Sequence, residues 1–147
     1  MELINPPGFG TMIRSYAQWS LPGTFDCNNV LSVFASQVHT GCLVGDIIVI
    51  QSCCQWTQTI ATGNMFAQVD DAVGVTACDF GSGPSLPFGY GFPAMPSGQS
   101  NNIVLHVWGR VLIAGSRTIR ISMIDTGTAV GHFANVGGVN SWVLKGT

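Results

Sequence analysis

The sequence predicts an all-β domain, either a sandwich or a barrel. Short runs rich in β-branched and aromatic residues recur along the chain, and Gly, Pro and Asn clusters separate them. No stretch beyond residue 30 has the apolar pattern of a long helix. The 147 residues are enough for one hydrophobic core, so we expect a single domain.

The first eleven residues, MELINPPGFGT, predict an extended N-terminal arm ahead of a domain that spans residues 12–147. The two adjacent prolines exclude a helix interior and a central strand. One interpretation is a frayed terminus, and the other is an arm that lies on a neighbouring protein. Apolar side chains favour the second interpretation, in which the arm contacts the neighbour through Leu3, Ile4, Pro6, Pro7 and Phe9.

Four segments before residue 81 have the pattern of strands. In the first, Ile13, Ser15, Ala17 and Trp19 alternate with the residues between them, and a Pro-Gly turn follows. The second segment, residues 28–40, fits a helical period in part, but its many β-branched residues favour a strand. The segments are 12–25, 28–40, 45–61 and 64–80, the last of which we expect to be broken near Asp70 and Asp71.

Residues 81–100 predict a long loop. The sequence GSGPSLPFGYGFPAMPSGQS is rich in Gly, Pro and Ser, which exclude a helix and would break a central strand. The loop either covers an edge of the core or contacts another subunit or a receptor. The side chains available for such a contact are Leu86, Phe88, Tyr90, Phe92 and Met95.

The most regular β pattern lies between residues 101 and 125. One face of the strand predicted at 103–113 is a core face, made of Ile103, Leu105, Val107, Val111 and Ile113. The opposite face is too apolar for open water, yet it contains a His and an Arg. Aromatic and Arg residues are enriched at protein interfaces. We therefore expect a subunit interface at Val104, His106, Trp108, Arg110 and Leu112.

The composition also predicts a covered surface. Only 8% of the residues are charged, against about 25% in an average domain, while 46% are hydrophobic. The longest apolar run, Ile47–Ile50, is far shorter than the roughly 20 residues of a membrane-spanning helix. The five basic residues are scattered, which argues against nucleic-acid binding. We therefore expect contacts with protein subunits and neither a membrane nor a nucleic acid as partner.

No group of residues predicts catalysis or a metal site. His39, His106 and His132 lack the spacing to other ligands that zinc requires, so we expect structural or interface roles for them. Asp70 and Asp71 would point to opposite sides of a strand, which favours a solvated turn over a calcium site. No nucleophile has an evident base and no nucleotide motif is present, so we expect no enzyme and no cofactor.

The five cysteines are odd in number and form no CxxC pair. The neighbours Cys53 and Cys54 would point to opposite faces of a strand. We expect mostly buried free thiols, with one or two disulfides as the alternative. Free thiols suit assembly in a reducing cytoplasm.

The C-terminal third of the chain resembles the C1q/TNF-like jelly rolls, and most of all those of bacteriophage structural proteins. The resemblance rests on HVWGRVLIAGSRTIRISMID at 106–125, on a glycine-rich turn that contains Asn135, and on the final SWVLKGT. Within it, a strand ends in Gly109-Arg110-Val111 and a turn contains Ala114-Gly115. The earlier part of the chain matches only in the rhythm of its strands.

This resemblance implies a ten-stranded jelly-roll sandwich that forms a tight homotrimer. The chain has no collagen stalk and no coiled-coil heptads, so the resemblance favours a capsid decoration (cement) protein over a fibre tip. The implied partners are other copies of the chain and the major capsid protein, on a virion surface assembled in the host cytoplasm. The alternative is a trimeric fibre tip or C1q-like recognition module that binds a host surface glycan or protein.

Overall fold

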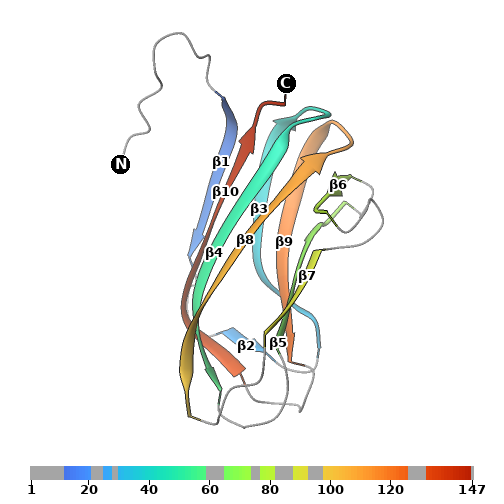
Figure 1. Ribbon diagram of the computed structural model, residues 1–147. Helices are drawn as coiled ribbons and strands as arrows, with labels where there is room; N and C mark the ends of the chain where they lie inside the picture. Colours follow the sequence, from blue (N-terminus) through green and yellow to red (C-terminus); the bar gives the residue numbers. More distant parts are fainter. Residues whose placement is uncertain are drawn as a thin grey trace.

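The computed structural model confirms the all-β class (Figure 1). It describes residues 12–20, 25–27, 30–58, 65–73, 77–81, 88–92, 98–125 and 132–146, which form ten strands and no helix. The described residues therefore contain no helix that could cross a membrane. The N-terminal arm predicted at 1–11 lies outside them.

The strands form two antiparallel sheets packed face to face (Figure 1). The front sheet has the order β1-β10-β4-β8-β6, with β2 also paired to β10, and the rear sheet has the order β3-β9-β5-β7. The front strands are β1 (Ile13–Ser20), β2 (Phe25–Cys27), β4 (Ile47–Gln58), β6 (Cys78–Asp79), β8 (Ser100–Val111) and β10 (His132–Leu144). The rear strands are β3 (Ser32–Cys42), β5 (Met65–Asp71), β7 (Phe88–Phe92) and β9 (Gly115–Asp125).

The strand order is that of a jelly roll. Strands pair from the two ends of the chain inward: β1 with β10, β3 with β9, β4 with β8 and β5 with β7. Successive pairs alternate between the two sheets, as in a long antiparallel ribbon wrapped around a core. The predicted jelly-roll sandwich is therefore confirmed, while the homotrimer stays a prediction.

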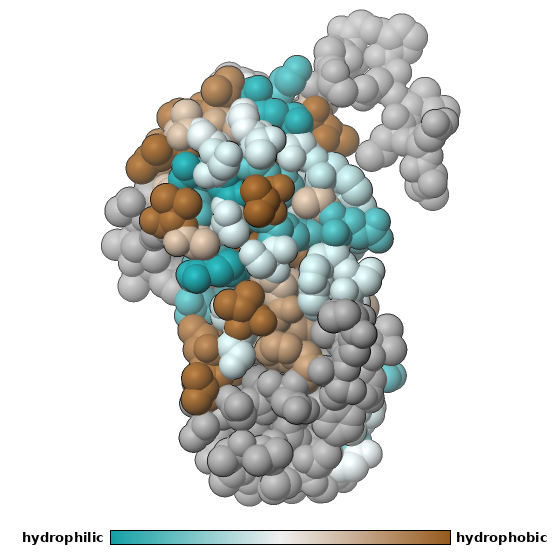
Figure 2. All heavy atoms as spheres, turned by 180° about the vertical axis from the view of Figure 1, so that it is seen from behind, coloured by the Kyte–Doolittle hydropathy of each residue, from teal (hydrophilic) through white to brown (hydrophobic). Residues whose placement is uncertain are grey.

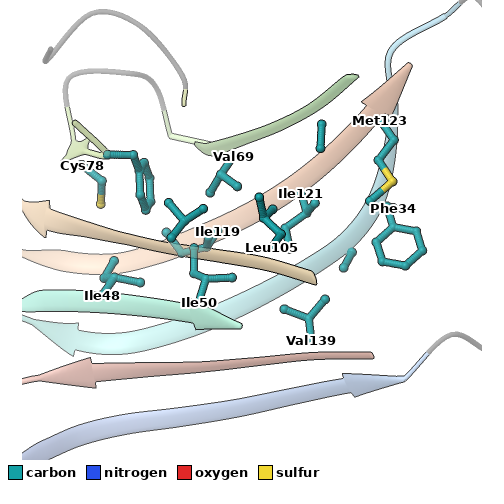
Figure 3. Close-up of a cluster of buried hydrophobic side chains, with 14 of the residues drawn as sticks. Phe34, Ile48, Ile50, Val69, Cys78, Leu105, Ile119, Ile121, Met123 and Val139 are labelled. Carbon is teal, nitrogen blue, oxygen red and sulfur yellow. The ribbon is translucent and has the colours of Figure 1, made fainter. Parts of the chain in front are cut away.

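The core lies between the sheets and follows the period of two in each strand (Figure 3). Ile48 and Ile50 of β4 face Ile121 and Met123 of β9 across it, each at most 2% exposed. The predicted contrast between Cys53 and Cys54 is confirmed, because the first is exposed and the second is buried.

A chain of hydrogen bonds also joins the two sheets. Ser141 Oγ donates to Gln37 Oε1 at 2.6 Å, so it accepts the bond from His39 Nε2 at 2.7 Å. His39 Nδ1 is then left to accept from Ser15 Oγ at 2.9 Å, and Gln37 Nε2 donates to the carbonyl of Val139 at 3.0 Å. Burial lowers the pKa of His39, which favours its neutral form. His39 is thus a structural histidine, as predicted.

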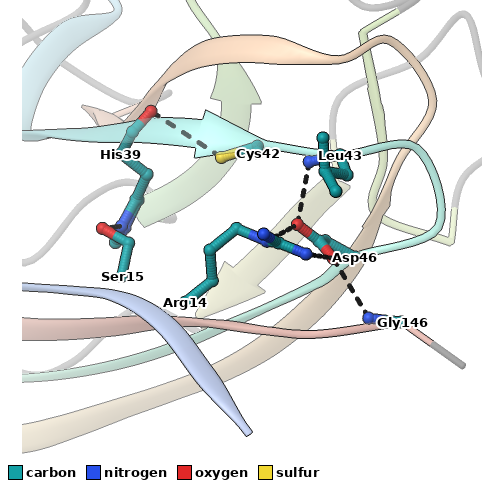
Figure 4. Close-up of polar contacts among 7 residues, drawn as sticks. All are labelled: Arg14, Ser15, His39, Cys42, Leu43, Asp46 and Gly146. Carbon is teal, nitrogen blue, oxygen red and sulfur yellow. Dashed lines mark hydrogen bonds and ion pairs between the residues drawn. The ribbon is translucent and has the colours of Figure 1, made fainter. Parts of the chain in front are cut away.

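Three ion pairs in the described parts of the chain use three of the five basic residues, and Figure 4 shows the pair of Arg14 with Asp46. Burial alone would raise the pKa of Asp46, but hydrogen bonds from Arg14 and from the backbone of Leu43 and Gly146 outweigh it and lower the pKa. These bonds fix the β3–β4 turn to β1 and to the C-terminal residues (Figure 4). Arg14 Nη2 lies 3.2 Å from Asp46 Oδ1.

The solvated turn predicted at Asp70 and Asp71 is wrong. Both residues belong to β5 and are buried, at 9% and 3% exposure. Their side chains do point apart: Asp70 makes a bidentate pair with Arg120, at 2.9 and 2.7 Å, on the outer side of the rear sheet. Asp71 points inward to Arg117 at 3.4 Å. Each carboxylate has its own guanidinium, which offsets the cost of burying the charge.

The loop predicted at 81–100 contains a strand. Residues 88–92 form β7, which pairs with β5 at the margin of the rear sheet. A margin strand tolerates glycine-rich sequence better than a central one, and Gly89 is required because a Cβ there would lie 2.2 Å from the Phe66 ring. The side chains proposed for contacts (Leu86, Phe88, Tyr90, Phe92 and Met95) lie outside the described parts.

The glycine-rich turn predicted around Asn135 is also wrong, since β10 runs unbroken through it with one bulge between Ala134 and Val136. The glycines serve close packing instead of a turn. A Cβ at Gly137 would lie 3.0 Å from the Phe34 ring and 3.1 Å from Cys54 Cβ. Glycine composition alone does not distinguish these two uses.

Candidate interaction surface

The outer side of the front sheet is the candidate functional site, and we call it the front face. Side chains of β1, β10, β4 and β8 that point away from the core form it, and the registers place them in rows across the sheet. One row is aromatic and apolar, and the next carries amides and an imidazole. The rows are Tyr16–Trp142–Val49–Trp108 and Gln18–Asn140–Gln51–His106.

The aromatic row is packed and partly exposed. The Tyr16 and Trp142 rings lie 5.7 Å apart between centroids, and the Tyr16 hydroxyl donates to Asn140 Oδ1 at 2.9 Å. Trp108, at the other end of the row, is 65% exposed, and Tyr16 is 51% exposed. Exposed aromatic side chains in one row are typical of contact surfaces.

The strand β8 alternates as the sequence predicts. Leu105, Val107 and Val111 are buried in the core. The residues predicted for a subunit interface point the other way on this strand and are exposed in the isolated chain: Val104, His106, Trp108 and Arg110. Their outward orientation agrees with the prediction, and their contact with another subunit remains a prediction.

Two positions at the end of this strand differ from the expectation. Ile113 was expected in the core but is 50% exposed, and Leu112, expected on the interface, is half-buried. Both follow the last residue of β8, where the backbone turns and the amide of Leu112 donates to the carbonyl of Ala77 at 2.9 Å. The period of two therefore ends at Val111.

The front face is almost free of charge. The charged side chains on the described part of this face lie at its margin, where Arg110 of β8 is opposite Asp79 of β6 in register. Arg14, Arg117 and Arg120 are held in ion pairs, and Lys145 follows the end of β10. A low charge content is typical of the centre of an interface.

The outer side of the rear sheet, the rear face, differs from the front face. Figure 2, turned by 180° from Figure 1, shows hydrophobic atoms interspersed with hydrophilic and neutral ones. The partly exposed ion pair of Arg120 with Asp70 lies on this face. Val38 is 59% exposed and Val33 is 48% exposed there, and both belong to β3.

The described residues contain no cluster of three or more His, Cys, Asp or Glu side chains that could hold a metal. Cys42, Cys53 and Cys78 are free thiols, and of these Cys42 and Cys78 are buried. Burial, with the nearby Asp71 carboxylate, raises the pKa of the Cys78 thiol to about 12. A thiol of that kind stays protonated at neutral pH and is a poor nucleophile.

Sequence reasoning missed the part that β1, β4 and β10 play in the front face. Tyr16, Val49 and Trp142 share a row with Trp108, although they are far apart in the chain. The alternation in residues 13–20 was visible, but only the pairing of strands places its outward residues beside Trp108. The side chains of the predicted arm and of His132 lie outside the described parts.

No known protein family matches the sequence, and no curated protein matches it. Solved structures show a likeness of fold. A chain of the infectious bursal disease virus Gx strain aligns over 92% of this chain with a TM-score of 0.53 and 8% identity. VP2 of the infectious bursal disease virus subviral particle aligns over 90% with a TM-score of 0.50 and 7% identity.

The chain spans about a third of the length of these two viral chains, since the alignments cover 33% and 34% of them. At such low identity the likeness concerns the fold alone. It agrees with the strand order, and together they establish that this chain is an all-β jelly-roll sandwich.

Proposed function

We propose that this chain is a structural protein of a virus particle, and specifically a trimeric capsid decoration protein. Its work is then to bind the shell and to stabilise it through contacts between subunits, with the major capsid protein as partner. Jelly rolls are frequent in viral capsid proteins. The two viral chains of similar fold, from a virus and a subviral particle, support this role.

The exposed aromatic row of the front face is the observation that carries the proposal. An exposed row that contains Tyr16 and Trp108 costs free energy in water, because apolar surface is worth about 25 cal/mol per Å² when it is removed from solvent. Copies of the chain that bury Val104, His106, Trp108 and Arg110 against one another recover that free energy. The free energy that remains after the entropic cost of association determines the affinity between the three chains.

Mass measurement tests the trimer, and an arm deletion tests the capsid contact. We expect the full chain and a chain that lacks residues 1–11 to form particles built from three-chain units in solution. We expect the shortened chain to lose attachment to viral shells, since Leu3, Ile4 and Phe9 belong to the proposed contact. A shortened chain that still decorates empty shells contradicts the role of the arm.

A recognition module is the second candidate, and the row of amides favours it. Gln18, Asn140 and Gln51 lie beside the aromatic row, and aromatic rings next to amides could bind the faces and hydroxyl groups of a neutral sugar. A glycan array with the full chain tests this candidate. Sugar binding that is lost in Trp108→Ala supports recognition, and no binding at high protein concentration contradicts it.

A further inference from the structure

The edge of β8 that points away from β4 is distinct from the front face. The hydrogen bonds of Val111 show which backbone groups of β8 point toward β4. The Val111 N–H donates to the carbonyl of Asp46 at 2.8 Å, and the Val111 carbonyl accepts from the N–H of Gly45 at 2.9 Å, both on the β4 side. Leu112 donates to Ala77 on the opposite side, toward β6. Along a regular strand the direction alternates from one residue to the next.

This alternation leaves a row of backbone groups without partners. The pairing of β8 with β4 has no bulge from Ser100 to Arg110, so the even-numbered residues point their N–H and C=O groups away from β4. The strand β6 pairs only with Arg110 and Val111. Among the described residues no strand pairs with the even positions before Arg110, namely Asn102, Val104, His106 and Trp108.

The other sheet margins have features that hinder pairing. A register shift interrupts β1 between Ile13 and Ser15, and β3 has two such shifts along its length. The margin strand β7 is five residues long and contains Gly89 and Gly91. Bulges, short strands, charges and prolines are the usual protection of an edge. Residues 100–109, SNNIVLHVWG, contain no charge and no proline.

A hollow lies beside this edge and has room for side chains of an added strand. Its volume is about 250 Å³, and it lies where β6 ends and the chain passes β8. Its lining residues come from β8 and from the two residues that follow β6: Phe80, Gly81, His106, Val107 and Trp108. Because three of them belong to β8, a strand laid along the edge could place side chains in this hollow.

We propose that the free edge of β8 pairs antiparallel with the same edge of a second copy of this chain. Because Arg110 is already occupied by β6, the longest self-pairing centres on Val104. It places Asn102 opposite His106 and Ser100 opposite Trp108, and each hydrogen-bonded pair exchanges two backbone bonds. No like charges meet across such a contact, because the run is uncharged.

The second copy suits this edge better than an unrelated strand because the contact is self-complementary and closed. Two copies related by a two-fold axis contact each other through the same surface, so after pairing neither β8 edge is left exposed. The protected margins at β1, β3 and β7 then oppose growth into a fibre. The contact uses backbone groups at the edge and does not depend on the capsid role.

Proline at position 104 tests the proposal with alanine as its matched control. Val104→Pro removes a backbone N–H that points away from β4, on the side of an edge strand where proline is tolerated. Val104→Ala also shortens the side chain but keeps this N–H. We expect Val104→Pro to weaken edge pairing at least about tenfold relative to Val104→Ala in sedimentation equilibrium, since two backbone hydrogen bonds are lost at the axis.

Hydrogen exchange of the unmodified chain gives a readout that does not depend on the variant folding. We expect the amides of Asn102, Val104, His106 and Trp108 to exchange slowly at high protein concentration and faster on dilution. Equal masses for the two variants, or fast exchange of these amides at every concentration, would overturn the proposal. Absence of the trimer in the unmodified chain, with slow exchange of the edge amides kept, would count against the trimer and leave the edge pairing standing.

Discussion

Replacing Trp108 by serine should separate assembly from folding. The Trp108 side chain is 65% exposed in the isolated chain, so the fold gains little from it. A Trp side chain buries about 200 Å² when it is fully covered, so assembly can cover about 130 Å² of it, or about 3 kcal/mol for each copy. A loss of that size weakens the association constant for each contact by about 100-fold or more.

Sedimentation equilibrium and urea unfolding of the same samples measure the two effects. We expect Trp108→Ser to dissociate at concentrations where the unmodified chain is assembled, while the unfolding free energy of the dissociated chain falls by at most about 2 kcal/mol, which corresponds to the part of the side chain that the fold already covers. Val38→Ser is the matched control, because Val38 is 59% exposed on the rear face. Equal assembly of Trp108→Ser and the unmodified chain, or an equal loss in Val38→Ser, refutes the role of the front face.

Three further predictions concern stability of the fold. Gly137→Ala should destabilise it by about 1–3 kcal/mol in urea unfolding, because the new Cβ meets the Phe34 ring at 3.0 Å; an unchanged midpoint contradicts the packing role of this glycine. Arg117→Met should cost about 3–5 kcal/mol, since it leaves the buried Asp71 carboxylate without its cation, and a loss below 1 kcal/mol contradicts that pairing. Burial lowers the pKa of His39 in the folded chain. Below about pH 6.5 the unfolded chain therefore binds a proton that the folded chain does not. The free energy of unfolding then decreases with falling pH until the lowered pKa of the folded chain is reached. His39→Gln should flatten this part of the stability curve between pH 4.5 and 8, and an unchanged curve contradicts the role of His39.

The sequence predicted the fold class because its strands carry a strong period of two. Ile119, Ile121 and Met123 alternate with polar residues, and the structure buries all three at 2% exposure. The same alternation placed Val104, His106 and Trp108 outward on β8. Local patterns of this kind survive folding because one face of each strand must pack on the core.

The features that the sequence did not predict depend on contacts between residues that are distant in the chain. The burial of Asp70 and Asp71 follows from Arg120 and Arg117 on the neighbouring strand, which no local pattern reveals. The use of glycine within β10 follows from the close approach of Phe34 to Gly137. Glycine-rich and acidic segments were therefore assigned to turns, although strand pairing gives them other roles.

The extent of the front face was likewise invisible to sequence reasoning. A resemblance in the C-terminal third indicated the interface on one strand, while the registers of β1, β10 and β4 show that Tyr16, Trp142 and Val49 continue it. A contact surface spread over four strands needs the sheet order, and the sheet order is set by tertiary pairing.

The mass of the Val104→Pro chain in solution, measured by light scattering at micromolar concentration, tests the account most directly. The single chain has a mass of 15.5 kDa. With the edge of β8 blocked, the account predicts particles of about three chains, held together by the front face. A stable, soluble single chain under these conditions, for both this variant and the unmodified protein, would contradict the claim that the front face is covered by other copies.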